Sequence, residues 1–416
     1  MTEPIALSAT WSRQPIPAGP AQVNYVLLSA IPAAVQTTEE GPPLNFCLIL
    51  DRSGSMAGPK IASLKTAVSE VIGKLRPQDV VSIVLFDDTL QVLVPARQAD
   101  DLPALQNAVE RIAEQGGTAM SLGLQAGLDE LRKFQAPDRV GRVILLTDGQ
   151  TWGDEPACRD LAAQIGALGV PITALGLGEE WNEQLLDDLA AASNGESDYI
   201  ADPDQIGKYF QQTLQTAKTT QVQNARLLLR LLPGVTPRAV YRVLPKIANL
   251  GYKPIGEREV IVDLGEITSE GASILVDMMI PEREAGTYRI AQAEVSFDAP
   301  LLNVAGGKVK IDVPLTLSPD PKAAVVDPQV MNTVEKVTAF KLQTRALSEA
   351  EVGNVAGATQ KLRAAATRLL DLGEAELAQT MQQSADQLEQ GGQISSADQK
   401  QLRYATRKLT QRLDNE

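Results

Sequence analysis

The sequence predicts a multidomain protein in which an α/β domain is inserted in an antiparallel β-sandwich and is followed by an α-helical bundle. At 416 residues the chain is too long for a single hydrophobic core. Short apolar runs alternate with helical stretches over residues 44–218, which indicates a mainly parallel sheet with helices on both faces. Strand-like segments then follow one another without helices over 219–318, and helical periodicity dominates 329–416.

Within 44–218 each element has its own pattern. The run "LNFCLIL" (44–50) is continuously apolar, which is typical of a strand covered on both faces. The segment 79–95 reads as two strands around a tight turn at Asp87–Asp88. Further strands are expected at 142–148, 171–177 and 197–201, and helices at 60–75, 101–114, 119–134, 156–168, 182–193 and 203–218.

The first forty residues have the same strand-like pattern as 219–318. "IALSATWS" and "QVNYVLLSAI" read as two strands, and two strands alone do not form a stable unit. We therefore expect 1–40 and 219–318 to form one sandwich that flanks the α/β domain. A Pro-rich linker at 319–328 precedes 329–416, where three or four helices are expected with breaks at Gly373 and 391–392.

Composition restricts the class of partner and the compartment. The net charge of -14 argues against nucleic acid and anionic membranes, which reward a basic face. No apolar stretch is long enough to span a bilayer, and the N-terminus has no secretory pattern. Cys47 lies inside an apolar run, and Cys158 is expected to be a structural thiol. These features favour a reducing, cytoplasmic setting.

The chain contains no histidine. Catalysis by Ser-His-Asp or Cys-His groups is therefore excluded, and so are zinc sites built on histidine. Any metal must be bound by oxygen, which selects Mg²⁺, Mn²⁺ or Ca²⁺. Neither common nucleotide-binding fingerprint is present.

Oxygen-bearing side chains follow the ends of the predicted strands. Asp51 ends the first strand and Asp148 ends the strand at 142–148, and ligands of such sheets bind beyond the carboxyl ends of strands. Ser53 and Ser55 follow Asp51 at alternating positions, and Thr118 follows two glycines before a predicted helix. Taken alone, Asp51–Ser55 fits a solvated turn as well as a metal site. The agreement of three separate segments favours the metal site.

These segments carry a family resemblance. "LILDRSGSM", "GGTAMSLGLQAGLDEL" and "VILLTDGQ" resemble the signature segments of the von Willebrand factor type A (VWA) domain. The resemblance implies a Rossmann-like sheet and a complete metal-ion-dependent adhesion site (MIDAS). In that site Mg²⁺ would be held by Ser53, Ser55 and Thr118, with Asp51 and Asp148 bound directly or through water. A Glu or Asp of a protein partner would complete the coordination. The flanking strands resemble bacterial proteins in which such a domain is inserted in a β-sandwich.

Other polar residues have plainer interpretations. For Asp87 and Asp88 a hairpin turn is favoured over a pair of functional carboxylates. Arg52 is expected to be an exposed spacer rather than a contact to the ligand's acid. Trp152, Asp154 and Glu155 lie on a loop after Asp148, where a solvated loop is favoured over a role in partner choice.

We expect a non-enzymatic protein that binds an acidic residue of a protein partner through the metal. A-domain proteins similar to this one act beside AAA+ ATPases of the metal-chelatase and MoxR types, so a non-ATPase subunit of such a complex is the alternative. Direct hydrolysis at the metal is disfavoured, because the sequence contains no convincing general base.

Overall fold

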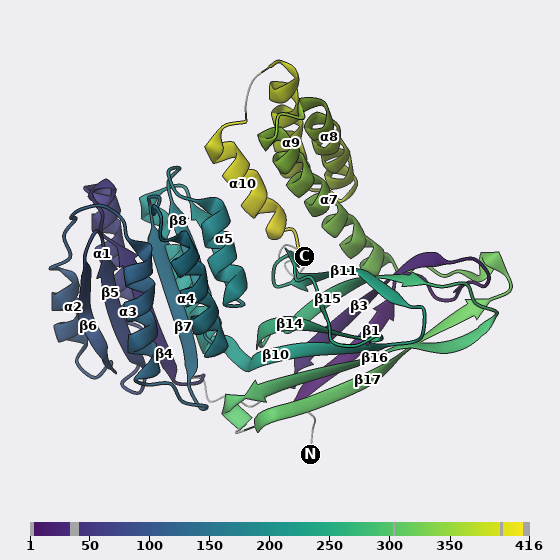
Figure 1. The fold of residues 1–416 in the computed structure, drawn as a ribbon, viewed down its shortest axis with the longest axis horizontal. Coiled ribbons are helices and arrows are strands. Elements are labelled where there is room, and N and C mark those ends of the chain that lie inside the picture. The colour runs from purple at the N-terminus through teal and green to yellow at the C-terminus, as the bar shows by residue number, and fades with distance from the viewer. Residues whose placement is uncertain (1–3, 34–40, 303, 392–393, 411–416) are drawn as a thin grey trace. The chain divides into compact units, whose positions relative to one another are not determined.

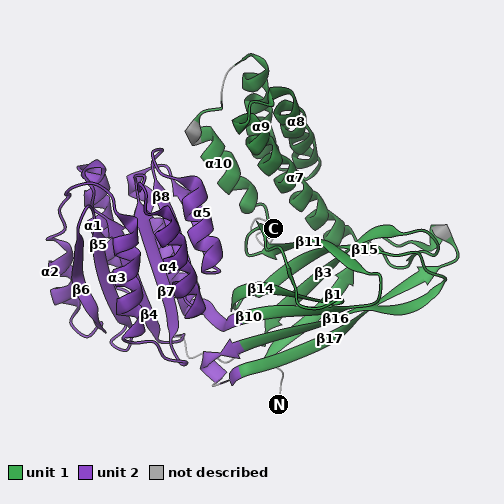
Figure 2. Cartoon of the chain, in the orientation of Figure 1, with its two compact units in different colours: residues 1–33, 225–297, 306–416 green, residues 34–224, 298–305 purple. Residues whose placement is uncertain are grey.

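The computed structural model describes residues 4–33, 41–302, 304–391 and 394–410 (Figure 1). Residues 1–3, 34–40, 303, 392–393 and 411–416 lie outside these ranges, so the parts of the sequence predictions that fall on them are not described. The chain divides into two compact units (Figure 2). The α/β unit comprises Ala34–Asn224 and Asp298–Ala305, and the β/helical unit comprises Met1–Ala33, Ala225–Phe297 and Gly306–Glu416.

The α/β unit is built on a six-stranded sheet in the order β6-β5-β4-β7-β8-β9. The strands are β4 (Leu44–Asp51), β5 (Val80–Phe86), β6 (Leu90–Gln98), β7 (Val140–Thr147), β8 (Ile172–Leu177) and β9 (Glu196–Ile200). All neighbours are parallel except β5 and β6, which form the predicted antiparallel hairpin. Every residue of β4 and β7 is buried, which explains why their sequences are mostly apolar at successive positions rather than alternating.

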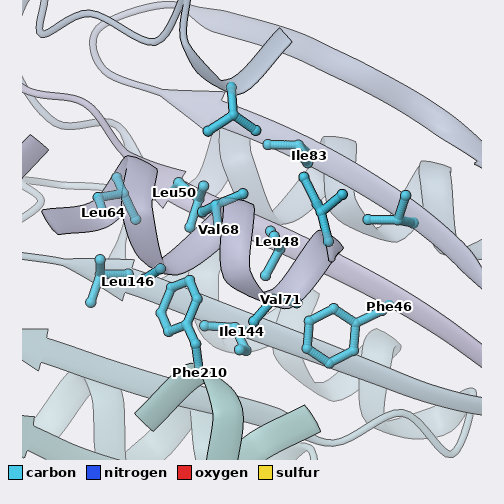
Figure 3. Close-up of a cluster of buried hydrophobic side chains, with 14 of the residues drawn as sticks. Phe46, Leu48, Leu50, Leu64, Val68, Val71, Ile83, Ile144, Leu146 and Phe210 are labelled. Atoms are coloured by element: carbon cyan, nitrogen blue, oxygen red, sulfur yellow. The ribbon is translucent and has the colours of Figure 1, made fainter. Parts of the chain in front are cut away.

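Helices flank this sheet. They are α1 (Pro59–Ile72), α2 (Leu102–Val109), α3 (Met120–Arg132), α4 (Glu155–Ala167), α5 (Glu183–Ala192) and α6 (Ile206–Thr219), with short 3-10 turns η1 (Gly54–Met56) and η2 (Pro203–Gln205). Leucine and valine side chains of α1 pack with Phe210 of α6 against β4 and β7 (Figure 3). Helix α3 approaches β4 closely, since a Cβ at Gly127 would stand 2.4 Å from Ile49 Cδ1. This approach fixes the position of the segment that leads into α3.

Helix α2 is shorter than predicted, ending at Val109 rather than near residue 114. The N–H of Glu110 still bonds to the carbonyl of Gln106 four residues back, but those of Arg111 and Ile112 bond to carbonyls three residues back, and the helix is not continued. Downstream, the N–H of Gln115 donates to the carbonyl of Arg52 over 2.7 Å. Tertiary pairing with the loop after β4 therefore overrides helical propensity here.

The β/helical unit contains two sheets, in the orders β1-β3-β15-β11-β12 and β13-β14-β10-β16-β17-β2. The longer strands are β1 (Ile5–Trp11), β3 (Gln22–Pro32), β10 (Thr220–Leu231), β11 (Thr236–Leu244), β14 (Glu259–Thr268), β15 (Ala272–Ile280), β16 (Gly286–Ala299) and β17 (Val304–Ser318). The short ones are β2 (Ile16–Pro17), β12 (Ala248–Asn249) and β13 (Lys253–Pro254). Antiparallel pairing of β3 with β15, with Val26 opposite Val276, joins strands from before and after the α/β unit in one sheet.

The turn between β16 and β17 differs from the expected domain limits. It contains the 3-10 turn η3 (Pro300–Leu302), and residues 298–305 group with the α/β unit. The side-chain amide of Asn224 donates to Asp298 Oδ2 over 2.8 Å, which ties the turn to the end of that unit.

The C-terminal helices are α7 (Pro328–Glu351), α8 (Val355–Asp371), α9 (Ala375–Glu389) and α10 (Ser396–Arg407). Helix α7 begins where Asp327 accepts the backbone N–H of Val330, and the 3-10 turn η4 (Pro321–Ala323) lies in the preceding linker. The predicted break at Gly373 separates α8 from α9, and α9 ends before Gly391.

The helices are not a separate bundle. Their apolar side chains share one core with Tyr241 and Val243 of β11 and Leu275 of β15. Tyr241 meets Phe340 of α7 edge-on, with ring centroids 6.5 Å apart. In the part of the chain that the structure describes, no helix is long and apolar enough to cross a membrane.

Candidate metal centre

Asp51 is the last residue of β4 and is fully buried. Its Oδ1 accepts the backbone N–H of Ser53 over 2.7 Å, and its Oδ2 accepts the hydroxyl of Thr147 over 2.6 Å. Thr147 ends the neighbouring strand β7, so the carboxylate is held from both adjacent strand ends. These contacts fix the direction of the Asp51 side chain.

The two serines connect Asp51's loop to Asp148. Ser53 Oγ and Ser55 Oγ lie 3.0 Å apart, and the hydroxyl of Ser55 donates to Asp148 Oδ1 over 2.6 Å. Asp148 follows β7 directly and is buried. The predicted ligands of the two strand ends are therefore joined in one hydrogen-bonded chain.

Thr118 comes from a different segment and reaches the same place. A Cβ at Gly149 would lie 3.5 Å from Thr118 Oγ1 and 3.8 Å from Ser55 Oγ. Gly149 follows Asp148, so Thr118, Ser55 and Asp148 meet around this glycine in a small cradle. A larger residue at position 149 would enter the space beside these hydroxyls.

Backbone contacts hold the Thr118 segment in position. The N–H of Gly54 donates to the carbonyl of Gly116 over 2.9 Å, and Asp88 Oδ2 accepts the N–H of Gly117 over 2.7 Å. The N–H of Ala119 donates to the carbonyl of Asp87 over 2.9 Å. Both the loop after β4 and the β5–β6 turn thus orient this segment.

The structure corrects the prediction that Arg52 is an exposed spacer. Arg52 is 9% exposed, and its guanidinium donates to Asp87 Oδ2 over 2.6 Å and to Gln91 Oε1 over 2.7 Å. The backbone N–H of Arg52 pairs with the carbonyl of Phe86, so the loop stays beside β5 and brings Arg52 to the hairpin. The sequence around Arg52 does not show this burial, because its partners lie in the β5–β6 turn and on β6.

Asp87 is placed in the predicted turn, but it is buried. Burial raises the pKa of Asp87, while hydrogen bonds from the backbone and hydroxyl of Thr89 and from Arg52 lower it more, so the net shift is downward. The carboxylate is therefore charged and paired with Arg52. Its role is to anchor the loop that carries Ser53 and Ser55.

Lys60 is a residue of this site that sequence reasoning missed. Its ammonium donates to Asp148 Oδ2. One sequence signal for Lys60 was available. It is the second residue of α1, and the start of a helix favours acidic rather than basic residues. A nearby anion offsets the unfavourable charge of a lysine at this position.

The electrostatics of Asp51 point to a cation. Burial raises the pKa of Asp51, hydrogen bonds from Ser53 and Thr147 oppose this shift, and the charge of Asp148 adds to it. Two carboxylates close together in a buried site need a positive charge if both are to ionise. Two carboxylates and three hydroxyls are hard oxygen donors, which suit Mg²⁺, Mn²⁺ or Ca²⁺. Within the described ranges no cluster of three or more Cys, Asp or Glu offers a different metal site.

A loop with an exposed tryptophan adjoins the cradle. Trp152 is 81% exposed between Thr151 and Gly153. The hydroxyl of Thr151 donates to the carbonyl of Thr118 over 3.2 Å and also contacts Asp154, whose Oδ2 accepts the N–H of Ser121 over 2.8 Å. The loop is thus held to the start of α3, so the solvated-loop interpretation understates its order.

Comparison with known proteins assigns this part of the chain. Residues 45–212 match the family model of the von Willebrand factor type A domain, and this segment is a VWA domain. Residues 328–412 match the model described as the Sll0103-like C-terminal alpha-helical domain. The predicted order, a Rossmann-like domain followed by a helical one, is therefore confirmed.

One relative matches nearly the whole chain, and another matches a shorter part of it. It is 29% identical over 416 residues to the uncharacterized protein sll0103 of Synechocystis sp., covering 98% of each. It is also 31% identical over 163 residues to inter-alpha-trypsin inhibitor heavy chain H1 of Mesocricetus auratus, which is 36% of this chain and 18% of that protein.

Two solved structures share the fold. A von Willebrand factor type A protein from Catenulispora acidiphila superposes with a TM-score of 0.80 at 20% identity, covering 98% of this chain and 97% of that one. The ArnB paralog VWA2 from Sulfolobus acidocaldarius gives a TM-score of 0.60 at 16% identity, covering 97% and 98%. The arrangement of sheets and helices is thus shared along nearly the full length.

Proposed function

We propose that this chain is a non-enzymatic, cytoplasmic binding protein of bacterial type, whose VWA domain is inserted in a β-sandwich and binds a protein partner through a metal ion. The metal would be Mg²⁺, held by Asp51, Ser53, Ser55, Thr118 and Asp148 in a MIDAS. The partner would supply a Glu or Asp side chain as the remaining ligand. The β-sandwich and the C-terminal helices would scaffold or regulate this contact.

The observation that carries the proposal is the convergence of the predicted ligands at one edge of the sheet. Asp51 and Asp148 follow the adjacent central strands β4 and β7, and Ser55 bonds Asp148 directly. The connection that leaves β4 leads to β5 on one side, and the connection that leaves β6 crosses to β7 on the other side of β4. Ligands of such sheets bind where the strand order reverses in this way.

The donor set suits an ion that accepts an external ligand. Neutral hydroxyls contribute three of the five side chains, so the protein supplies less negative charge than a carboxylate cage. Bound Mg²⁺ would supply a Lewis-acidic centre with affinity for a carboxylate oxygen.

A binding role is supported over catalysis by the engagement of the polar groups. Asp51 is hydrogen-bonded to Ser53 and Thr147, and Asp148 to Ser55 and Lys60. Hydrolysis at a metal requires a positioned water and a general base. The absence of histidine removes the most common base.

Calorimetric titration tests the metal assignment. Mg²⁺ should bind wild type at one site and should bind neither Asp51→Ala nor Thr118→Ala. Asp129→Ala is the matched control, because Asp129 is an exposed carboxylate on α3 that contacts Gln125 and Arg132. Equal binding of Mg²⁺ by wild type and Asp51→Ala would overturn the assignment.

Partner capture tests the interaction. Immobilised wild type should retain specific proteins from native lysate in Mg²⁺ and release them in EDTA, and Asp51→Ala should retain none of them. Retention of an AAA+ ATPase under these conditions would support the alternative role as a non-ATPase subunit of a MoxR-type or chelatase-type complex. Retention that is identical with and without EDTA would contradict metal-dependent binding.

A further inference from the structure

Lys60 places a fixed positive charge against one of the predicted metal ligands. Its ammonium donates to Asp148 Oδ2, while Asp148 Oδ1 accepts the hydroxyl of Ser55. The Asp148 side chain is fully buried, and that of Lys60 is 31% exposed. The two oxygens of Asp148 therefore have different partners: Oδ1 bonds to Ser55, and Oδ2 bonds to the ammonium of Lys60.

The position of Lys60 is unfavourable for helix α1 itself. Lysine follows Pro59 in the first turn, where exposed backbone N–H groups repel a cation. The first turn of α1 also contains no acidic residue that would offset this repulsion. The contact with Asp148 compensates locally, so the charge of Lys60 belongs to the site rather than to the helix.

A charge count shows what Lys60 does to the site. Asp51 and Asp148 carry two negative charges and Lys60 one positive charge, while Arg52 and Asp87 pair with each other and cancel. A divalent cation changes the net charge from minus one to plus one. One incoming carboxylate then brings it to zero. Without Lys60, the metal-loaded site would already be neutral before the carboxylate arrived.

We propose that Lys60 sets the charge of the metal site, weakening its hold on the divalent cation and strengthening the hold of the metal-loaded site on an acidic partner residue. This inference rests on the proposed function. The physical reason is Coulombic: the lysine charge repels the ion and attracts the partner's carboxylate. Lys60 is thus a specificity-determining residue that trades affinity for metal against affinity for the ligand.

A purely structural role for Lys60 makes the opposite prediction. If Lys60 only holds Asp148 in its orientation, its removal should weaken metal binding, because a ligand would lose its support. The sign of the change in metal affinity therefore separates the two roles.

The first experiment titrates Mg²⁺ by calorimetry into the full chain carrying Lys60→Gln. We expect about tenfold tighter binding than in wild type, as removal of one nearby unit charge can produce. Lys65→Gln is the matched control: it removes the same charge from the same helix, where Lys65 donates to the carbonyl of Glu110 instead. Lys65→Gln should bind Mg²⁺ as wild type does, and Lys60→Arg, which keeps the positive charge, should bind it more weakly than Lys60→Gln.

The second experiment uses a capped Gly-Glu-Gly peptide as the acidic probe at saturating Mg²⁺, with capped Gly-Gln-Gly as the uncharged control. Lys60→Gln should bind the acidic probe about tenfold more weakly than wild type, and Lys60→Arg should bind it more tightly than Lys60→Gln because it keeps the charge. Unchanged or weaker Mg²⁺ binding in Lys60→Gln would overturn the inference, and so would unchanged binding of the acidic probe.

Failure of the inference and failure of the proposed function give different results. Wild type that binds no Mg²⁺, or binds it equally in Asp51→Ala, would overturn both. Binding that is lost in Asp51→Ala but unchanged in Lys60→Gln would overturn only the role of Lys60. Thermal unfolding in EDTA verifies that each variant is folded before it is titrated.

Discussion

Arg52 and Asp87 form a buried ion pair in which the guanidinium Nε lies 2.6 Å from carboxylate Oδ2. Arg52 stands between two predicted ligands, Asp51 and Ser53, while Asp87 lies in the β5–β6 turn. The same turn bonds Gly117 and Ala119 on either side of Thr118. The pair therefore connects the loop that carries Ser53 and Ser55 to the turn that holds the Thr118 segment.

Breaking this pair should destabilise the α/β unit. Arg52→Ala leaves the Asp87 carboxylate buried without its cation, and we expect a loss of about 3 kcal/mol in the free energy of unfolding, measured by denaturant titration. Arg97→Ala is the control, because the Arg97–Asp100 pair is exposed and should contribute less than about 1 kcal/mol. Equal losses in the two variants would show that the buried pair has no special role.

The hydroxyl of Thr147 should tune metal affinity without binding the metal itself. It donates to Asp51 Oδ2 over 2.6 Å, and loss of such a supporting bond typically weakens metal binding about 10- to 100-fold. We expect this effect for Thr147→Val in calorimetry with Mg²⁺. Thr147→Ser retains the hydroxyl and should bind nearly as wild type. Wild-type affinity in Thr147→Val would mean that Asp51 needs no support.

Trp152 should contribute to partner binding and not to stability. Its ring is 81% exposed on a loop held to α3, so Trp152→Ala removes little buried apolar area. We expect an unchanged melting temperature and unchanged Mg²⁺ affinity, with reduced retention of metal-dependent partners in the capture experiment. Trp181→Ala is the contrast: Trp181 is buried and donates to the carbonyl of Gly178, and its loss should cost about 3–5 kcal/mol. Full partner retention in Trp152→Ala would exclude a contact through this ring.

The two cysteines should be unreactive in the folded protein. Both thiols are free and buried, and burial raises the pKa of Cys47 to about 12 and also raises that of Cys158. Thiolate is the reactive form, so a thiol reagent such as Ellman's should detect no cysteine in the native protein. Both should react after denaturation in guanidinium chloride. Rapid reaction of either thiol in the native protein would show that the structure around it opens to solvent.

Acid should weaken the β/helical unit partly through Glu294. A hydrogen bond from Arg230 lowers the pKa of Glu294 below its ordinary value of 4.5, against a smaller opposing effect of burial. The folded chain therefore binds fewer protons at this group than the unfolded chain, and the stabilisation is present above pH 4.5 and lost as the pH falls below it.

The variant Glu294→Gln isolates this effect. Its difference in unfolding free energy from wild type should be less than about 1 kcal/mol at neutral pH, because the Arg230 side chain is partly exposed. The difference should shrink in denaturant titrations as the pH falls below 4.5. A difference that stays constant with pH would show that the ion pair does not account for it.

How much of the fold was predictable depended on whether the signal lay within one segment. The runs that became β4 and β7 are buried along their whole length, so their sequences carried the strand signal unaided. The strand-like segments expected within 219–318 are 224–235, 258–267, 272–281, 286–297 and 308–317, and they leave out β11. Its pairing with β15 is interrupted by irregularities near Pro237 and Arg242, which disturb the alternation that sequence reasoning relies on.

The sequence by itself determined the α/β alternation, the presence of C-terminal helices, and the oxygen-bearing residues at the ends of β4 and β7. Tertiary structure decided that the helices share a core with β11 and β15, that Arg52 is buried against Asp87, and that Lys60 contacts Asp148. The physical reason is the separation along the sequence over which each interaction acts. Periodicity and strand-end chemistry are properties of one segment, whereas the partner of a charge 35 or 88 residues away depends on which segments the fold brings together.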